Sequence, residues 1–523
     1  MGRPPPRLRN RARSVAVPPA LTSAAVPSFV LTNTLTRRAE PLVPAETLPD
    51  GTPHLRFYSC GPTVYSRAHI GNFRTFLTAD LVVRVARALG WHVTYVSNIT
   101  DVGHLTEDDV ADAAGEDKMQ KALRSKDGER FANVYDLARY YADALEADWR
   151  KLNLAEPTVR PRATEHVTDQ VEAVERLVAS GHAYETAQGV YFSVTAFPAY
   201  GRLSGNTLDT ATNEAVRDVV IDPEKRDPRD FALWKRDAAH LMQWYSPFGR
   251  GFPGWHIECS VMARRYLGDT LDLHGGGEDL IFPHHECEIA QSEALTGKPF
   301  ARAWLHTRFL QVEGEKMSKS KGNFYTVSDL VDGEGIDPLV LRYALISGQY
   351  KKPLNFTRKN LADSARSVER YRDAHRAALA ASEADAPGED RIGERLDVIY
   401  ARTLEALCDD LNTPVALAAA LEGARLVQGM GANLNGASAR SALGWIERTH
   451  ALLGFVTPDY AADAAPAPAE PGLPADAEAL VAARKAARDA RDFAESDRLR
   501  DALLALGVEV RDTPAGQEVR RVG

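Results

Sequence analysis

Two short strand-like runs on either side of one long helical run constrain the fold more than any other feature of this sequence. Residues 54–60 alternate apolar and polar side chains and stop at a Gly-Pro pair. Residues 70–89 carry apolar side chains at helical spacing up to Gly90, and residues 92–99 are rich in β-branched and aromatic side chains. Strand, helix and strand in this order predict a right-handed βαβ unit and therefore a parallel sheet. Such sheets bind ligands beyond the carboxyl ends of their strands.

The rest of the sequence predicts an α/β core that is interrupted once and followed by helices. Residues 146–245 include a hairpin-like turn at 187–189 and are interpreted as an insertion between two halves of the sheet. Residues 361–455 are helical and alanine-rich, which is typical of a helix bundle. Residues 457–475 are rich in Pro and Ala, as in a linker, and residues 476–523 read as one charged helix with a two-strand tail.

The first 27 residues are set aside from fold reasoning. Five arginines occur within the first 13 residues, and the first carboxylate is Glu40. An organelle transit peptide has this composition, but we favour a disordered extension or a start codon assigned too early. A secretory signal is not expected, because no solid apolar core precedes a cleavage site.

Composition excludes several classes of protein. No apolar run approaches the roughly 18 residues that span a bilayer, so no membrane partner is expected. With 72 acidic and 63 basic residues the net charge is −9, which excludes a histone-like nucleic-acid binder but leaves a localised nucleic-acid site open. Four cysteines in 523 residues cannot form a disulfide framework and indicate a reducing compartment. We therefore expect a cytoplasmic enzyme.

The H-I-G-N sequence of residues 69–72 combines two polar side chains with a glycine at a predicted helix start. Helix N-terminal amides attract anions, Gly71 lets the backbone approach a ligand, and His69 donates hydrogen bonds. The arrangement suits a polyphosphate. On its own, however, so short a motif is more often an ordinary helix start.

Residues 316–321 (K-M-S-K-S-K) follow a predicted strand and precede a glycine. Three lysines beside small hydroxyl residues make a cationic loop that can close over a phosphate leaving group. A solvated basic turn is the commoner explanation for a lysine-rich hexamer considered alone.

Four residues from three segments suit a zinc ion. His284 and Glu288 are four residues apart and share one helix face, and Cys60 and Cys259 supply two thiolates. No C-x-x-C pair is present, so an ordinary His/Glu surface pair is favoured by spacing alone. A phosphate-binding G-x-x-x-x-G-K-[ST] loop, an H-E-x-x-H helix and a G-x-S-x-G elbow are all absent from the sequence.

In combination, these motifs are specific. H-I-G-N followed about 240 residues later by K-M-S-K-S resembles the paired ATP motifs of class I aminoacyl-tRNA synthetases. Residues 57–65, 254–260, 274–288 and 410–414 are similar to cysteinyl-tRNA synthetases, and the similarity extends from Phe29 to the C-terminus.

The resemblance implies a Rossmann-type parallel-sheet catalytic domain with a connective insertion, an α-helical bundle and a small anticodon-binding module. It also implies that L-cysteine and ATP with Mg²⁺ give cysteinyl-adenylate and pyrophosphate, and that the acyl group then passes to the terminal adenosine of tRNA(Cys). A monomer is expected. The domains expected in chain order are 1–27, the extension or misassigned start; 28–145, the first half of the catalytic core; 146–245, the connective insertion; 246–325, the second half with the K-M-S-K-S loop; 326–360, a stem-contact segment; 361–456, the bundle; 457–475, the linker; and 476–523, the anticodon-binding module.

The resemblance also assigns roles to single residues. One zinc per chain would bind the substrate's sulfur, and it would stabilise a thiolate (free pKa about 8.5) far more readily than a serine alkoxide. An apolar pocket separates such near-isosteres only about a hundredfold, so metal selection makes a separate editing domain unnecessary. The zinc ligands carry over to Cys60, Cys259, His284 and Glu288; the catalytic residues to His69, Asn72, Lys316 and Lys319; ATP binding to these four with Gly71 and Asp279; and substrate binding to Gly61, Thr100, Trp255 and His274.

One departure and two rivals qualify the resemblance. Asn72 stands where the class motif ends in histidine, and its amide donates a hydrogen bond but brings no positive charge. An ATP-dependent cysteine–amino-sugar ligase of the same ancestry shares the adenylate chemistry but lacks the full tRNA-binding tail. A catalytically inactive RNA-binding regulator built on a synthetase fold is the second rival, and the intact lysines and all four candidate zinc ligands argue against it. Tail contact with tRNA would use arginines at 484, 488, 491 and 498 along one helix and at 511, 520 and 521 beyond it, although acids interleave with them as in an ion-paired helix.

Overall fold

The computed structural model describes residues 27–107, 111, 114–207, 224–318, 322–455, 475–490, 492–506, 508–513 and 516–521. The predicted extension before residue 27, the predicted linker before residue 475, and Lys319 lie outside these residues. Within the described ranges, none of the helices combines the length and apolar character needed to cross a membrane.

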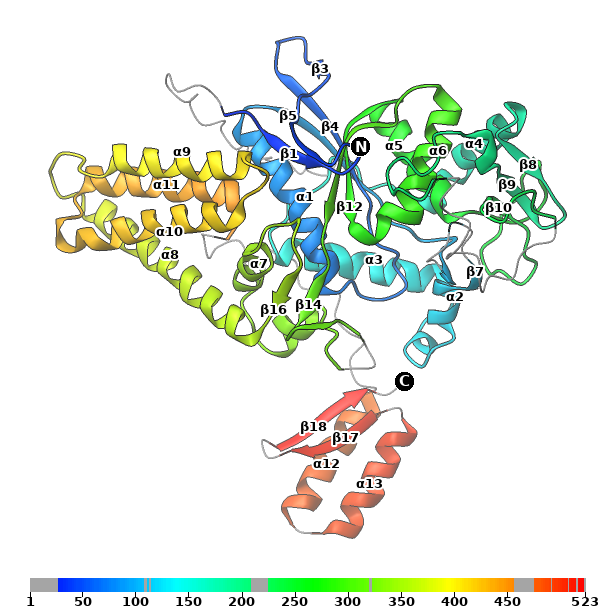
Figure 1. The fold of residues 1–523 in the computed structure, drawn as a ribbon. Coiled ribbons are helices and arrows are strands. Elements are labelled where there is room, and N and C mark those ends of the chain that lie inside the picture. The colour runs from blue at the N-terminus through cyan, green and yellow to red at the C-terminus, as the bar shows by residue number, and fades with distance from the viewer. Residues whose placement is uncertain are drawn as a thin grey trace, which may run out of the picture.

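A five-stranded sheet forms the centre of the main body of the protein (Figure 1). Its strands are β3 (Glu46–Thr47), β4 (Pro53–Ser59), β5 (His92–Ser97), β12 (Leu271–Gly277) and β13 (Ala301–Thr307). Strands β5, β4, β12 and β13 lie side by side in this order and run parallel, whereas β3 pairs with β4 antiparallel. The chain leaves β4 toward one side of the sheet and β12 toward the other. Their carboxyl ends therefore flank a topological switch point, where such sheets bind ligands.

Helix α1 (Ile70–Ala88) connects β4 to β5 and completes the βαβ unit, so the predicted parallel sheet is confirmed. It packs between the sheet and two later helices, α7 (Pro338–Ile346) and α11 (Gly436–Leu453), which explains why most of its residues are buried. Helix α5 (Trp255–Leu267) precedes β12, and α6 (Glu286–Thr296) connects β12 to β13. Both helices begin near the carboxyl edge of the sheet and run back toward the starts of the next strands, β12 and β13.

The chain between β5 and α5 adds helices and a second sheet beside the core (Figure 1). The helices are α2 (Lys118–Leu123), α3 (Val134–Lys151) and α4 (Val167–Ala179). The sheet is antiparallel, in the order β11 (Phe252–Pro253), β10 (Phe231–Lys235), β9 (Gly189–Phe192) and β8 (Ala183–Glu185). Gly189 is required where β9 approaches β10, because a Cβ there would lie 2.0 Å from the carbonyl oxygen of Trp234.

Two strand pairs and one three-stranded sheet complete the body. They are β1 (Val30–Asn33) with β2 (Arg38–Pro41), β6 (Leu105–Glu107) with β7 (Ala114–Asp117), and β14 (Leu310–Val312) between β15 (Glu315–Lys316) and β16 (Leu354–Phe356).

Four helices form the bundle: α8 (Arg358–Ala384), α9 (Gly393–Cys408), α10 (Thr413–Met430) and α11. Asp410, between α9 and α10, ties the bundle to the body. Its carboxylate accepts hydrogen bonds from the backbone N–H and hydroxyl of Thr32, both at 2.7 Å, and from Tyr350 and Lys351. Asp410 and Leu411 have φ of 55° and 49°, a left-handed conformation that costs about 1–3 kcal/mol per non-glycine residue and persists because these contacts over-determine it.

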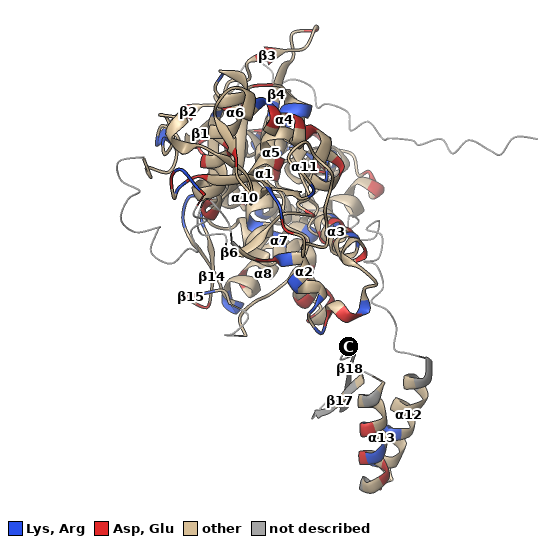
Figure 2. Ribbon diagram, turned by 90° about the vertical axis from the view of Figure 1, so that its right-hand side faces the viewer, with Lys and Arg blue, Asp and Glu red and all other residues tan. Residues whose placement is uncertain are grey.

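The C-terminal module differs from the single helix predicted for it. It contains α12 (Ala475–Asp489), α13 (Phe493–Ala505), β17 (Val508–Thr513) and β18 (Gly516–Arg521). The helix is broken because Asp492 starts α13, where its side chain accepts from the N–H of Glu495. Arg498 therefore lies on a different helix from Arg484, which is itself buried, and Arg491 lies outside the described residues. Acidic and basic residues both occur along α13 (Figure 2), and Arg498 pairs with Glu495 at 2.6 Å.

Candidate functional site

The four predicted zinc ligands meet at the carboxyl edge of the central sheet. Cys60 follows β4, Cys259 lies in α5, His284 lies in the turn before α6, and Glu288 lies in the first turns of α6. All four are buried, and one ligand atom from each lies within 4.8 Å of the others. The Sγ atoms of Cys60 and Cys259 are 3.9 Å apart, and His284 Nε2 is 2.8 Å from Glu288 Oε1.

The separation of the two cysteine sulfurs fits a tetrahedral zinc ion. Two sulfurs that each lie about 2.3 Å from a tetrahedral zinc are about 3.8 Å apart, close to the separation of the two cysteine sulfurs here. Two thiols, one imidazole and one carboxylate are also the donor types that zinc prefers. The residues therefore fit the metal that the sequence predicts.

A neighbouring histidine fixes which nitrogen of His284 faces the other ligands. His256 Nε2 is 2.9 Å from the carbonyl oxygen of Ala111, so it carries a proton, and His256 Nδ1 is left to accept. His284 Nδ1 lies 3.0 Å from that acceptor and must donate to it. Nε2 of His284 consequently faces Glu288 and the cysteines, in the orientation that a hydrogen bond from the other ring nitrogen gives to metal-ligating histidines.

Electrostatics also favour a cation at this position. The pKa of His284 is raised to about 10, because the Glu288 carboxylate and Cys259 outweigh the lowering effect of burial. Burial raises the pKa of Cys60 well above its usual range. Burial alone would raise the pKa of Glu288, but His274 and His284 hold it well below its usual value. Protons on His284 and Cys60 thus occupy donor atoms that a divalent cation would otherwise bind, while the Glu288 carboxylate stays ionised.

A second buried group overlaps the first. His274 and His285 lie with Cys60 and Glu288 on the other side of the shared thiol and carboxylate. His274 Nε2 is 2.7 Å from Glu288 Oε2, and His285 Nε2 is 3.3 Å from Cys60 Sγ. His274 was predicted to line the substrate pocket, whereas His285 was not predicted. The His-His doublet in the sequence was the one signal for it.

The other predicted pocket residues lie beside this cluster. Gly61 follows Cys60, and a Cβ there would lie 1.6 Å from the carbonyl oxygen of Asn98, so only glycine fits. Thr100 is buried and donates to Glu258 at 2.5 Å. Trp255 lies against the imidazole of His284, with ring centroids 4.6 Å apart and planes tilted by 31°. Glu258, which sequence reasoning missed, has its pKa raised well above the usual range by burial and by Cys259.

The H-I-G-N sequence begins α1 with a capping box. His69 Nδ1 accepts from the backbone N–H of Asn72 at 3.1 Å, and Asn72 Oδ1 accepts from the N–H of His69 at 3.0 Å. The His69 ring proton is therefore on Nε2, and Asn72 keeps its amide N–H groups as donors. Both are donors at a helix N-terminus, which suits an anion.

The segment around the predicted cationic loop lies against this helix start. The N–H of Ile70 donates to the carbonyl of Tyr325 at 3.0 Å, and His69 pairs with Thr326. A Cβ on Gly71 would lie 3.3 Å from Met317 Cε, so the two predicted ATP motifs are neighbours. Lys316 ends β15 and is exposed, and Lys319 lies outside the described residues.

Asp279, predicted for the ATP ribose, lies in a short 3₁₀ turn directly after β12 and is exposed. It is therefore at the carboxyl edge of the sheet. A Cβ at Gly277 would lie 2.2 Å from Asp279 Oδ1, so a larger residue at 277 would displace this carboxylate.

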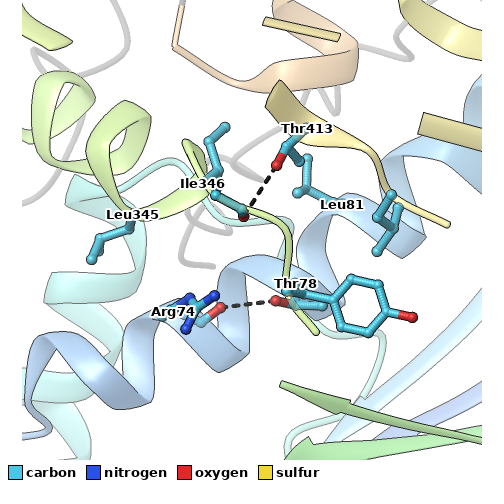
Figure 3. A pocket seen from close by; sticks show the side chains of 9 residues that line it. Arg74, Thr78, Leu81, Leu345, Ile346 and Thr413 are labelled. Atoms are coloured by element: carbon cyan, nitrogen blue, oxygen red, sulfur yellow. Dashed lines mark hydrogen bonds between the residues drawn. The ribbon is translucent and has the colours of Figure 1, made fainter. Parts of the chain in front are cut away.

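Arg74, which sequence reasoning missed, holds α1 in place through hydrogen bonds to neighbouring segments. Arg74 is buried, and its guanidinium donates to four backbone carbonyls, those of Arg308, Phe309, Gln349 and Lys352, at 2.6–3.0 Å. It borders a small cavity between α1, α7 and the start of α10 (Figure 3), where Thr78 donates to the carbonyl of Arg74. Arg74 thereby fixes the helix whose first turn carries His69 and Asn72.

Family models and named relatives match this chain over most of its length. Residues 48–366 match the family described as tRNA synthetases class I (C) catalytic domain, and residues 470–520 match the cysteinyl-tRNA ligase anticodon binding domain. A cysteine–tRNA ligase of Salinibacter ruber is 60% identical over 95% of this chain and 98% of its own length. A cysteine–tRNA ligase of Chlorobaculum tepidum is 41% identical over 94% of this chain and 98% of its own length.

The chain belongs to the cysteinyl-tRNA synthetase family.

Solved structures agree with this cysteinyl-tRNA synthetase fold. Methionyl-tRNA synthetase of Mycobacterium tuberculosis, in complex with methionyl-adenylate, matches with a TM-score of 0.54 and 16% identity over 79% of this chain and 93% of its own. A leucyl-tRNA synthetase of Agrobacterium radiobacter matches with a TM-score of 0.57 and 11% identity over 80% and 86% of the two chains. The predicted fold class is confirmed. The match to an anticodon-binding domain supports the main prediction over the amino-sugar ligase.

Proposed function

We propose that this chain activates L-cysteine with ATP and transfers the cysteinyl group to tRNA(Cys), the activity for which its relatives are named. The observation that carries the proposal is the meeting of Cys60, Cys259, His284 and Glu288 beside the carboxyl ends of β4 and β12. When bound by these four residues, zinc would ligate the substrate's thiolate and so select cysteine over serine.

In the first reaction an oxygen of the cysteine carboxylate attacks the α-phosphorus of ATP, and the bond to the β-phosphate breaks to release pyrophosphate. Charge develops on the phosphate oxygens. His69 Nε2–H, the Asn72 amide and the N-terminal amides of α1 donate hydrogen bonds to this charge. Lys316 and Lys319 neutralise the leaving pyrophosphate, and Asp279 binds the ribose.

In the second reaction a hydroxyl of the terminal adenosine of tRNA attacks the carbonyl carbon of cysteinyl-adenylate, AMP leaves, and the hydroxyl proton is released. Gly61, Thr100, Trp255 and His274 hold the amino acid during both reactions. Mg²⁺ accompanies ATP. The expected domain division, monomeric state and cytoplasmic location remain predictions.

Transfer of labelled cysteine to purified tRNA, with ATP and magnesium, tests the proposal when zinc is quantified on the same sample. We expect cysteine-specific charging and about one zinc per chain. Adenylate formation without charging would favour the amino-sugar ligase, and no activation in a zinc-replete sample would favour the regulator.

A further inference from the structure

His104 joins three segments of the chain, one of which carries Trp255 of the predicted amino-acid pocket. Its ring contacts Thr63, in the loop after Cys60; Lys118, the first residue of α2; and Trp255, the first residue of α5. It is only 6% exposed, so these contacts are shielded from water.

The two ring nitrogens of His104 are held from opposite sides. Lys118 Nζ is 2.9 Å from Nε2, and an ammonium group only donates, so Nε2 accepts. Nδ1 therefore carries the ring proton and donates to Thr63 Oγ1. The carbonyl of His104 also accepts from the backbone N–H of Lys118 at 2.8 Å. With both nitrogens and the backbone held, the imidazole plane has one orientation.

This oriented ring lies flat on the indole of Trp255. The ring centroids are 4.0 Å apart and the planes differ by 13°, which is a parallel stack. Trp255 in turn lies 4.6 Å from the ring of His284, with an interplanar angle of 31°. The indole is therefore held between His104 and a predicted zinc ligand.

We propose that His104 is a positioning residue for cysteine binding: by orienting the Trp255 indole, it sets the wall of the amino-acid pocket beside the metal ligands. This inference rests on the proposed function. His104 acts through Trp255 and Thr63, and we assign it no contact with ATP. Its removal should therefore affect cysteine binding and leave ATP binding and zinc content unchanged.

The test is cysteine-dependent ATP–pyrophosphate exchange by full-length, zinc-loaded protein. His104→Ala removes the stack and both hydrogen bonds, and we expect the KM for cysteine to rise about tenfold. The KM for ATP, kcat and bound zinc should stay within about twofold of the parent. A loss of kcat with an unchanged KM for cysteine would overturn the proposal. Kinetics equal to the parent's in every parameter would also overturn it.

Two milder variants keep the test decisive if His104→Ala fails to fold. Thr63→Val and Lys118→Met each remove one of the hydrogen bonds to the ring, and each should raise the KM for cysteine several-fold without lowering bound zinc. An unchanged KM for cysteine in both would refute the inference.

His54→Ala is the matched control. His54 also bonds a threonine hydroxyl, that of Thr94 at 2.7 Å, and meets an aromatic ring, that of His92, but it lies at the opposite end of β4. Its exchange kinetics should equal the parent's. If the parent itself shows no cysteine-dependent exchange, the proposed function fails; if the parent exchanges normally and the KM for cysteine is unaltered in the variants, the role of His104 alone fails.

Discussion

Replacing Arg342 with methionine should destabilise the catalytic body strongly. Arg342 is distant in sequence from α1, but its side chain helps to hold α1 in place. Arg342 lies in α7 with no exposed surface. Its guanidinium pairs with Asp80 of α1 and donates to the carbonyls of Leu453, Leu152 and Asn153 at 2.8–3.0 Å. It thus joins α1, α7, the end of α3 and the end of α11.

The magnitude follows from what each partner retains. Asp80 keeps both bonds from Arg84 Nε at 2.9 Å, and the carbonyl of Asn153 keeps a bond from Arg84 at 2.6 Å. The carbonyls of Leu152 and Leu453 lose the guanidinium donor, at about 1–3 kcal/mol each, and the bond to Asp80 is also lost. Removing the desolvated guanidinium offsets part of this cost. We expect a net loss of about 4 kcal/mol, within the range for breaking a buried ion pair.

Urea unfolding followed by tryptophan fluorescence measures this loss, because all 7 tryptophans lie between residues 91 and 445 and none in the C-terminal module. Arg402→Met is the matched control. Its exposed pair with Glu422 joins α9 to α10 at 3.0 Å and should contribute only about 0–1 kcal/mol. A loss below about 1 kcal/mol for Arg342→Met, equal to that of the control, would refute the reasoning.

Four further outcomes are expected. His284→Ala should lower bound zinc and the affinity for cysteine together, and full zinc occupancy by metal analysis would contradict the assignment of His284 as a zinc ligand. Lys319→Ala should slow adenylate formation by orders of magnitude in a rapid-quench assay while leaving zinc content unchanged; an unaffected rate would remove this lysine from its role. Gly61→Ala should displace the backbone after Cys60, because its Cβ would meet the carbonyl of Asn98, and we expect zinc and exchange activity to fall together; normal values for both would contradict the steric argument. Burial, with help from Arg84, lowers the pKa of His450 to about 3, below its unfolded value near 6.5. The unfolded chain therefore binds the extra proton first, and this contribution to stability is complete above about pH 6.5 and declines as the pH falls toward 3. The urea midpoint of His450→Gln should accordingly depend less on pH between about 4 and 6 than that of the parent, and parallel pH curves would contradict this.

Local sequence signals predicted the elements that position the site. The alternation in residues 54–60 and the helical spacing in 70–89 depend only on near neighbours, because each periodicity reflects one buried face. Gly90 and the Gly-Pro pair after Cys60 ended these elements as expected. The parallel sheet followed, since two strands joined by a helix pair in parallel.

The C-terminal module shows where such signals fall short. Helical spacing continues on both sides of Asp492, so the sequence reads as one helix with arginines along it. In the structure Asp492 caps a new helix, and burial of Leu503 and Ala477 in one small core folds α13 against α12. A short side-chain cap and the need to bury two apolar faces together decided the break.

By itself, the sequence determined which residue types are available for chemistry: two cysteines, a His-His doublet, a nearby carboxylate, a helix-start histidine and a cationic loop. Spacing alone could not determine which of them meet, and the four zinc ligands were grouped by their donor chemistry and by the family resemblance. Only the tertiary structure placed Met317 beside Gly71, and made Cys60 and Glu288 common to two overlapping groups of possible ligands. The physical reason is that these contacts join residues some 200 positions apart. Strand order and helix packing set such contacts, and no local periodicity encodes them.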